Sequence, residues 1–101
     1  MFNRTKSRWE TSTHRTAHLT AAQIWEIGYR HVEDASRNRS IKARADGAFK
    51  VVVDRGLRLD VNGEPYPRHV DIVAWPEEKH ARLMTATEIA VSLKLEVDPR
   101  R

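Results

Sequence analysis

His69 and Asp71 have the residue types and spacing that come closest to a site for chemistry. They alternate in segment 68–74, which is predicted to be a strand, so both side chains project to one face about 6–7 Å apart. An imidazole and a carboxylate at that separation can bind one metal ion or exchange a proton with one substrate. Further candidate ligands follow after a turn, namely Glu77, Glu78 and His80. No recognisable spacing specifies a third ligand, so the alternative is that His69 and Asp71 are structural partners on the wetter face of a sheet.

His14 and His18 have the spacing by which two histidines share a metal ion on a helix. They lie in a Thr-rich stretch that is expected to be extended, where four residues separate them by about 13 Å. The pair is therefore expected to be solvated. The chain also lacks a Gly-x-Ser-x-Gly motif, a glycine-rich phosphate loop and a His-Glu-x-x-His motif. We expect no catalytic residue and no cofactor.

The cations are dominated by arginine, which supplies 13 of the 18. Arginine offers bidentate contact with phosphate or carboxylate groups. If a flexible N-terminal arm folds near the loop after residue 36, a basic patch with a stacking aromatic results, as in single-strand binders. The candidate nucleic-acid-binding residues are Arg37, Arg39, Lys42, Arg44, Arg8 and Trp9. The alternative is a solvated charged loop.

Aromatic and arginine side chains together are typical of protein interfaces. Trp25 lies one position off the stripe formed by Ile24, Ile27 and Gly28, so it is the aromatic residue expected at the surface. The candidate contact residues for a protein partner or for self-association are Trp25, Tyr29, Arg30, Arg68, His69 and Asp71.

Composition limits the possible classes of protein. The 101 residues are enough for a single compact domain. The absence of cysteine excludes a disulfide scaffold, a thiol nucleophile and cysteine-ligated metal sites. No apolar run is long enough for a membrane helix and no leader resembles a signal peptide, so we expect a cytoplasmic protein with no membrane partner. The net charge of +4 permits nucleic acid as a partner without requiring it.

The first half of the chain contains one well-marked helix. Thr20 and Gln23 have the spacing of a capping box, and the apolar residues that follow predict a helix over 20–35. A short strand is expected at 41–45. Segment 47–55 has the composition of a strand but also the periodicity of a short helix, and we favour the helix.

The second half is predicted to contain a strand at 57–61, a half-buried strand at 68–74 and a helix at 76–94. Pro76 suits the first position of that helix. One stripe of the helix consists of His80, Leu83, Met84, Thr87, Ala90 and Val91. The sequence thus predicts an α+β fold, with a sheet of three or four short strands and two main helices on one face. Residues 11–97 form the domain, between a flexible basic arm at 1–10 and a tail at 98–101.

The segment Pro67–Lys79 resembles a small family of uncharacterised bacterial proteins that carry a P-R-H-A-N-[IV]-[VT]-G-W-P-x-E-K stretch. The similarity extends upstream through Leu19-Thr20, Ile24-Trp25, Gly28, Arg44-Ala45-Asp46 and Gly56-Leu57. Asp71 and Ala74 depart from the asparagine and glycine that are usual there. The resemblance implies a helix between Asp46 and Gly56, and it implies no activity.

These observations favour a non-enzymatic protein-interaction module, an accessory subunit of a larger bacterial or phage assembly. The alternative is a nucleic-acid-binding accessory protein that uses the arginine-rich patch. A metal-dependent enzyme centred on His69 and Asp71 is a third possibility.

Overall fold

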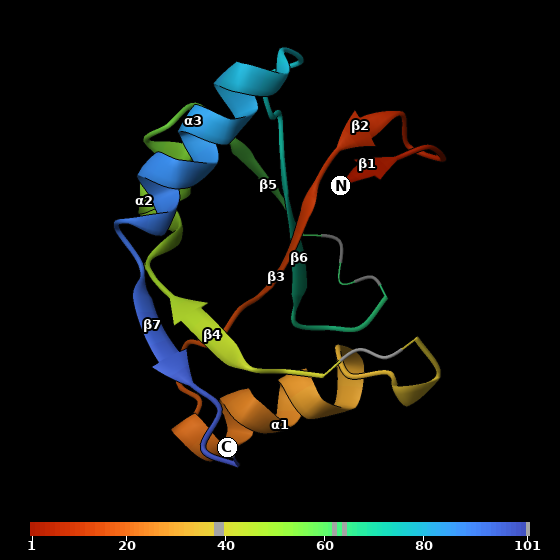
Figure 1. Ribbon diagram of the computed structural model, residues 1–101, viewed down its shortest axis with the longest axis vertical. Helices are drawn as coiled ribbons and strands as arrows, with labels where there is room; N and C mark the ends of the chain where they lie inside the picture. Colours follow the sequence, from red (N-terminus) through yellow and green to blue (C-terminus); the bar gives the residue numbers. More distant parts are fainter. Residues whose placement is uncertain (38–39, 62, 64, 101) are drawn as a thin grey trace. The chain divides into compact units, whose positions relative to one another are not determined.

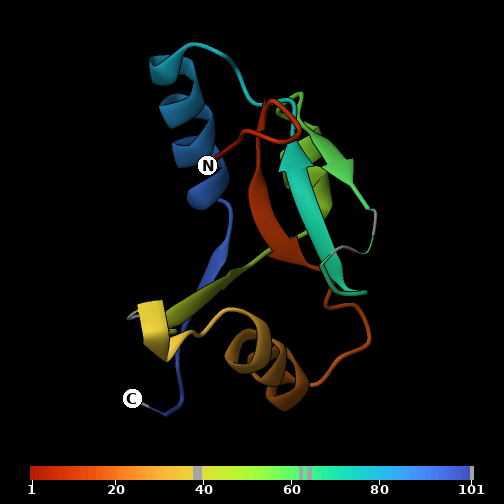
Figure 2. The same ribbon diagram turned by 90° about the vertical axis from the view of Figure 1, so that its right-hand side faces the viewer.

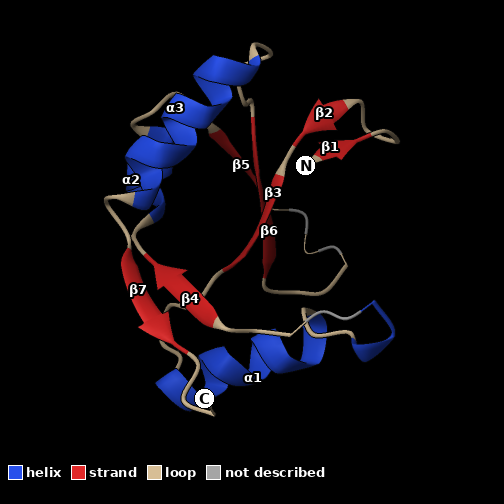
Figure 3. Ribbon diagram, in the orientation of Figure 1, coloured by secondary structure: helices blue, strands red, loops and turns tan. Residues whose placement is uncertain are grey.

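The computed structural model of this protein describes residues 1–37, 40–61, 63 and 65–100. In these residues the chain is an α+β protein, as the sequence predicts, with short strands in small antiparallel sheets and helices between them (Figure 1, Figure 3). The strands are β1 (Phe2–Asn3), β2 (Arg8–Trp9), β3 (Thr11–His14), β4 (Ala43–Asp46), β5 (Arg58–Asp60), β6 (His69–Val73) and β7 (Lys94–Val97). The helices are α1 (Ala21–His31), α2 (Phe49–Val53) and α3 (Lys79–Ala90), with a 3-10 turn at Ala35–Arg37.

The chain divides into two compact units, each built from two separate segments. Unit 1 comprises Met1–Arg15 and Gly47–Leu93, and unit 2 comprises Thr16–Asp46 and Lys94–Arg101. The sequence predicts instead a single domain over 11–97, and that division stays a prediction. The segment predicted to be a flexible arm, residues 1–10, contains the antiparallel pair β1–β2.

Unit 1 is built on a three-stranded sheet in the order β3-β6-β5, with β6 in the middle (Figure 2). Along β6 the side chains alternate, so that Ile72 joins the apolar core while His69 and Asp71 project to the opposite face. All five residues of β6 are buried. The prediction of a half-buried strand is therefore wrong, because polar side chains from other strands cover the second face.

The apolar core of unit 1 lies between this sheet and the two helices of the unit. Its buried members are Val52, Leu57, Ile72 and Ile89. Val52 comes from α2, so segment 47–55 does contain a helix, as the sequence analysis favours. A buried valine or isoleucine contributes about 1.5–3 kcal/mol relative to an exposed one, so α2 and α3 are held by their packing on the sheet.

Helix α3 begins later than the sequence predicts. Pro76 lies outside it, and Glu78 is the N-cap, whose carboxylate accepts hydrogen bonds from the backbone N–H groups of His80 and Ala81. The intervening corner is a turn in which Ala74 has a positive φ of 66°. The Trp75 indole there donates to the carbonyl of Ile72 at 3.1 Å, which fixes the strand-to-helix connection.

Unit 2 consists of α1 and the two-stranded ribbon β4–β7. The predicted capping box is confirmed: the Thr20 hydroxyl accepts from the Gln23 backbone, and the Gln23 side chain accepts from the Thr20 backbone. The helix ends at His31, earlier than predicted, because Asp34 accepts from the backbone and hydroxyl of Ser36 and starts a turn. Strand β7 occupies residues that the sequence analysis assigns to the end of a helix and the segment after it.

Candidate functional site

The two residues that the sequence singles out for chemistry, His69 and Asp71, lie close together and are buried from solvent. His69 and Asp71 are each 4% exposed, and His69 Nε2 lies 3.5 Å from Asp71 Oδ1. Neither His69 Nδ1 nor Asp71 Oδ1 has a hydrogen-bond partner among the described residues. Burial raises the pKa of Asp71, while the charge of His69 opposes that shift. The pair is therefore buried, not placed on a solvated face of the sheet, and its use as a contact for a partner stays a prediction.

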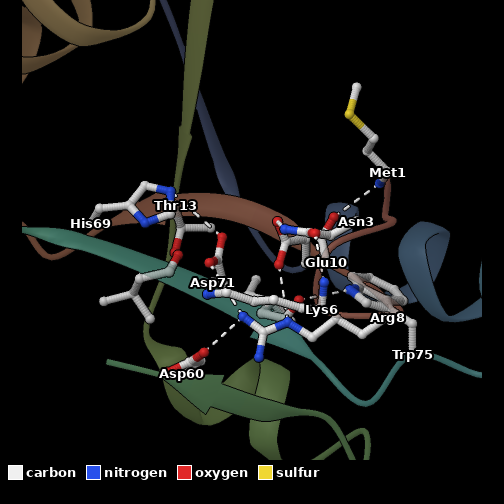
Figure 4. Close-up of polar contacts among 12 residues, drawn as sticks. Met1, Asn3, Lys6, Arg8, Glu10, Thr13, Asp60, His69, Asp71 and Trp75 are labelled. Atoms are coloured by element: carbon white, nitrogen blue, oxygen red, sulfur yellow. Dashed lines mark hydrogen bonds and ion pairs between the residues drawn. The ribbon is translucent and has the colours of Figure 1, made fainter. Parts of the chain in front are cut away.

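One guanidinium, that of Arg8 on β2, contacts three carboxylates, those of Glu10, Asp60 and Asp71. Its Nη2 lies 2.7 Å from Asp60 Oδ2 and 3.5 Å from Asp71 Oδ2. Its Nε donates to Glu10 at 3.0 Å (Figure 4). Asn3 donates to the other oxygen of Glu10 at 2.8 Å. These bonds attach the N-terminal segment to the polar face of the sheet. The attached segment covers that face, which is why His69 and Asp71 are buried.

Aromatic rings complete the cover on the His69 side. The Tyr66 ring centroid is 5.3 Å from those of His14 and His69, and the Tyr66 hydroxyl is hydrogen-bonded to His14 Nε2. Burial, and to a lesser extent the charge of Asp71, raises the pKa of Tyr66. In the part of the chain that the structure describes, no three His, Cys, Asp or Glu side chains are placed to hold a metal ion. We interpret the cluster as a structural network.

The candidate nucleic-acid-binding residues fall in both units. Arg8 and Trp9 belong to unit 1, whereas Arg37, Lys42 and Arg44 belong to unit 2. The remaining one, Arg39, lies outside the described residues.

Several of these candidates are already engaged by other side chains. Arg44 Nε is 3.0 Å from Asp46, and the exposed Arg37 lies 3.6 Å from Asp34. The face of the Trp9 ring is covered by the Arg82 guanidinium, whose carbon is 3.7 Å from the ring centroid. Lys42 is exposed.

The aromatic contact candidates of unit 2 form an internal stack. Trp25 and Tyr29 are stacked with their centroids 6.1 Å apart, Arg44 lies over Trp25 at 4.8 Å, and Arg100 lies over Tyr29 at 3.5 Å. Trp25 is only 9% exposed, so the prediction that it reaches the surface is wrong. The reason is that the β4–β7 ribbon and the C-terminal residues cover this face of α1, which periodicity alone does not reveal.

A buried carboxylate locks the C-terminal residues onto this stack. Asp98 is 1% exposed and accepts hydrogen bonds from the Tyr29 hydroxyl at 2.8 Å and from Arg100. These bonds, those of Arg100 first, lower the pKa of Asp98 to about 2. Arg100 also bonds Glu33 at 2.6 Å.

The two remaining contact candidates also make local bonds. The exposed Arg30 pairs with Glu26 at 3.9 Å, in the i,i+4 spacing along α1. Arg68 donates to the carbonyl of Arg15 at 3.2 Å, within unit 1.

The structure exposes an apolar surface elsewhere, on α3. Leu83, Met84 and Val91 are 57%, 52% and 79% exposed, whereas Ile89 on the opposite side of the helix is buried. The stripe that the sequence marks on this helix therefore faces outward, and we call Leu83, Met84, Thr87, Ala90 and Val91 the α3 stripe. The sequence carries this signal, but a helical stripe of apolar residues more often faces a core than solvent, so the pattern alone does not identify a surface.

A second apolar surface lies on the β4–β7 ribbon. Ala43 pairs with Val97 and Ala45 with Leu95, so these four side chains share one face, and all four are exposed. Leu95 and Val97 are 69% and 66% exposed.

Comparison with protein-family models, with curated proteins and with solved structures finds no match to this chain. The resemblance of the segment Pro67–Lys79 to a bacterial family therefore stays a prediction. No helix in the described residues has the length and apolar content that crossing a membrane requires.

Proposed function

We propose that this chain is a non-enzymatic protein-interaction module, an accessory subunit of a larger cytoplasmic assembly, and that it binds its partner through the α3 stripe. The observation that carries the proposal is the outward orientation of Leu83, Met84 and Val91, each more than half exposed on one side of a helix. Exposed apolar side chains gathered on one face are typical of interaction sites. The cytoplasmic placement rests on the sequence, which has no cysteine.

The stripe has the chemistry of a helix that docks in an apolar groove. Its members from Leu83 to Val91 carry no charge, and the hydroxyl of Thr87 donates to the carbonyl of Leu83, which satisfies its own donor. The apolar residues Leu83, Met84, Ala90 and Val91, at i, i+1, i+7 and i+8, present one side of the helix to a partner, with Thr87 between them at i+4. The expected partner is therefore a protein with an apolar groove.

The packing of α3 orders the α3 stripe before a partner binds. Ile89 anchors the helix in the core of unit 1, and Glu78 caps its first turn. A helix that is already ordered loses little conformational entropy when it binds. The surface does not have to fold before it can be recognised.

Nucleic acid is less well supported as the partner. Of the candidate arginines, Arg8 is surrounded by three carboxylates and Arg44 is paired with Asp46. Arginines in such pairs have fewer donors to offer to phosphate groups. The hypothesis of single-strand binding also needs Trp9 as a stacking surface for a base, and Arg82 covers that ring.

The proposal is tested by affinity capture with matched variants. The wild-type chain, a Leu83→Lys/Met84→Lys variant and a Lys50→Glu control are immobilised, and bound protein and nucleic acid are both measured. We expect one protein to bind the wild type and the control in stoichiometric amount at low and at moderate salt, and binding to be lost in the α3 variant. The proposal would be contradicted if nucleic acid were captured equally by the wild type and the α3 variant, in an amount that declines steeply with salt concentration. Such a steep salt dependence is typical of phosphate binding, because counterions are released on binding.

A further inference from the structure

The outer edge of β7 presents free strand positions in a defined pattern. The backbone N–H of Asp98 donates to the carbonyl of Lys42 at 2.8 Å, in the same antiparallel register that pairs Arg44 with Glu96. Hydrogen-bonded pairs alternate along such a ladder, so the N–H and C=O groups of Leu95 and Val97 point away from β4. No other strand pairs with β7 among the described residues.

An exposed edge of this kind is a template for another strand. Two strand edges can form an antiparallel pair only in certain registers. In these, a residue whose N–H and C=O groups point outward on one strand lies opposite a residue of the same kind on the other strand. For two copies of β7 this condition is met when Leu95 of one chain lies opposite Leu95 of the other, which also places the two exposed leucine side chains next to each other on the apolar face.

The charges of β7 favour that register over its neighbours. With Leu95 opposite Leu95, Lys94 of each chain lies opposite Glu96 of the other, which gives two pairs of opposite charge. If the pairing slips to the adjacent allowed register in one direction, Lys94 lies opposite Lys94; in the other direction, Glu96 lies opposite Glu96. Like charges directly opposite each other are unfavourable. Backbone direction and the pairing of Lys94 with Glu96 thus agree on one arrangement, which also brings the two Leu95 side chains into contact.

We propose that β7 pairs with β7 of a second copy of this chain, antiparallel and in the register that places Leu95 opposite Leu95. The contact is isologous, so it closes as a two-fold dimer with a four-stranded sheet in the order β4-β7-β7-β4. Such a sheet relieves the marginal stability of an isolated two-stranded ribbon. A strand pair this short buries less than the ~1,200 Å² of stable complexes, so the dimer dissociates on dilution. This surface lies in unit 2 and is distinct from the α3 stripe.

The charge pattern allows a test in which two defective variants rescue each other. In Lys94→Glu the new carboxylate of each chain faces Glu96 of the other, and in Glu96→Lys the new ammonium group of each chain faces Lys94 of the other. We expect the dimer of each variant alone to be weakened roughly tenfold or more, since two favourable pairs become repulsive. An equimolar mixture has opposite charges at both intermolecular pairs again, and sedimentation equilibrium is expected to show a heterodimer more stable than the homodimer of either variant.

Two substitutions at Leu95 test the backbone contact separately. Leu95→Pro removes the outward N–H and takes no hydrogen bond from the β4–β7 pair, whereas Leu95→Val keeps that N–H. We expect Leu95→Pro to be monomeric and Leu95→Val to dimerise. Circular dichroism and thermal unfolding establish that both variants are folded.

Three results would overturn the proposal. The first is a wild-type chain that stays monomeric at every concentration. The second is a dimer that is unaffected both by Leu95→Pro and by the single charge variants. The third is a mixture of the charge variants that fails to associate. A dimer that survives Leu95→Pro but is lost in Leu83→Lys/Met84→Lys would assign self-association to the α3 stripe, which separates this proposal from the proposed function.

Discussion

Asp60 and Asp71 lie directly opposite each other on the adjacent strands β5 and β6, and the same Arg8 nitrogen contacts both carboxylates. Like charges in opposed positions destabilise a sheet unless a cation compensates them. Arg8 comes from the N-terminal segment, about fifty residues earlier in the chain than Asp60. The pairing of β5 with β6 therefore depends electrostatically on the first strands of the chain.

Replacing Arg8 is expected to destabilise unit 1. In Arg8→Met the buried Asp71 faces Asp60 without the guanidinium that contacts both carboxylates, and breaking a buried ion pair costs about 3–5 kcal/mol. Because Arg8 is 26% exposed, we expect a smaller loss, about 2–3 kcal/mol, in the free energy of unfolding by urea. Arg58→Met, a change of the same type at an exposed position of β5, serves as the control and is expected to stay within ~0.5 kcal/mol. Equal losses in the two variants would refute the compensation.

The Asp98 cluster predicts a loss of stability in acid. The pKa of Asp98 is about 2 in the folded chain, below its ordinary value, and Arg100 also lowers the pKa of Glu33. Carboxyl groups with lowered pKa values stabilise the fold above their unfolded pKa and lose that contribution as the pH falls through the folded pKa. We expect the urea midpoint to decline between about pH 4 and pH 2.

Two variants test whether the Asp98 cluster causes this loss of stability at low pH. Asp98→Asn is expected to flatten the decline, and Tyr29→Phe, which removes one donor to Asp98, to reduce it in part. An acid profile that is identical in the wild type and in Asp98→Asn would show that other groups cause it.

Ala74 is expected to be a site where glycine stabilises the protein. Its φ of 66° lies in the left-handed region, which costs an L residue about 1–2 kcal/mol. Ala74→Gly is therefore expected to raise the free energy of unfolding by about 1 kcal/mol. The same substitution at Ala86, an exposed interior position of α3, is expected to lower it by about 1 kcal/mol, since glycine is a poor helix former. Thermal unfolding distinguishes the two signs, and destabilisation by Ala74→Gly would contradict the prediction.

The two sides of α3 are expected to respond differently to substitution. Met84→Lys changes an exposed side chain and should alter the free energy of unfolding by no more than ~0.5 kcal/mol. Ile89→Ala leaves a cavity in the core and is expected to cost about 2–5 kcal/mol. A large loss in Met84→Lys would mean that the α3 stripe is covered within the folded chain.

Local signals in the sequence predict much of the secondary structure. The capping box at Thr20 marks the start of α1, and the alternation from 69 to 73 marks β6 and the face that each of its residues takes. The helix periodicity of 47–55 also outweighs its β-rich composition, because Val52 can reach the core. These features depend on neighbouring residues, which the sequence displays directly.

Features that depend on distant residues could not be predicted in this way. The burial of His69 and Asp71 requires Arg8, and the burial of Trp25 requires Arg44 and the C-terminal residues. The orientation of α3 follows from the core position of Ile89, since the helix has apolar residues on both sides. Strand β7 is short and is defined by its pairing with β4 more than by its own composition.

The most direct test of the interaction proposal is site-specific photo-crosslinking in cells. A photoreactive residue is introduced at Met84 in the α3 stripe and, in separate chains, at Lys50, an exposed position of α2. We expect one discrete protein adduct from position 84 that is absent from position 50 and lost when Leu83 is changed to Lys. No adduct at position 84, or the same adducts from both positions, would contradict the assignment of the α3 stripe as the binding surface.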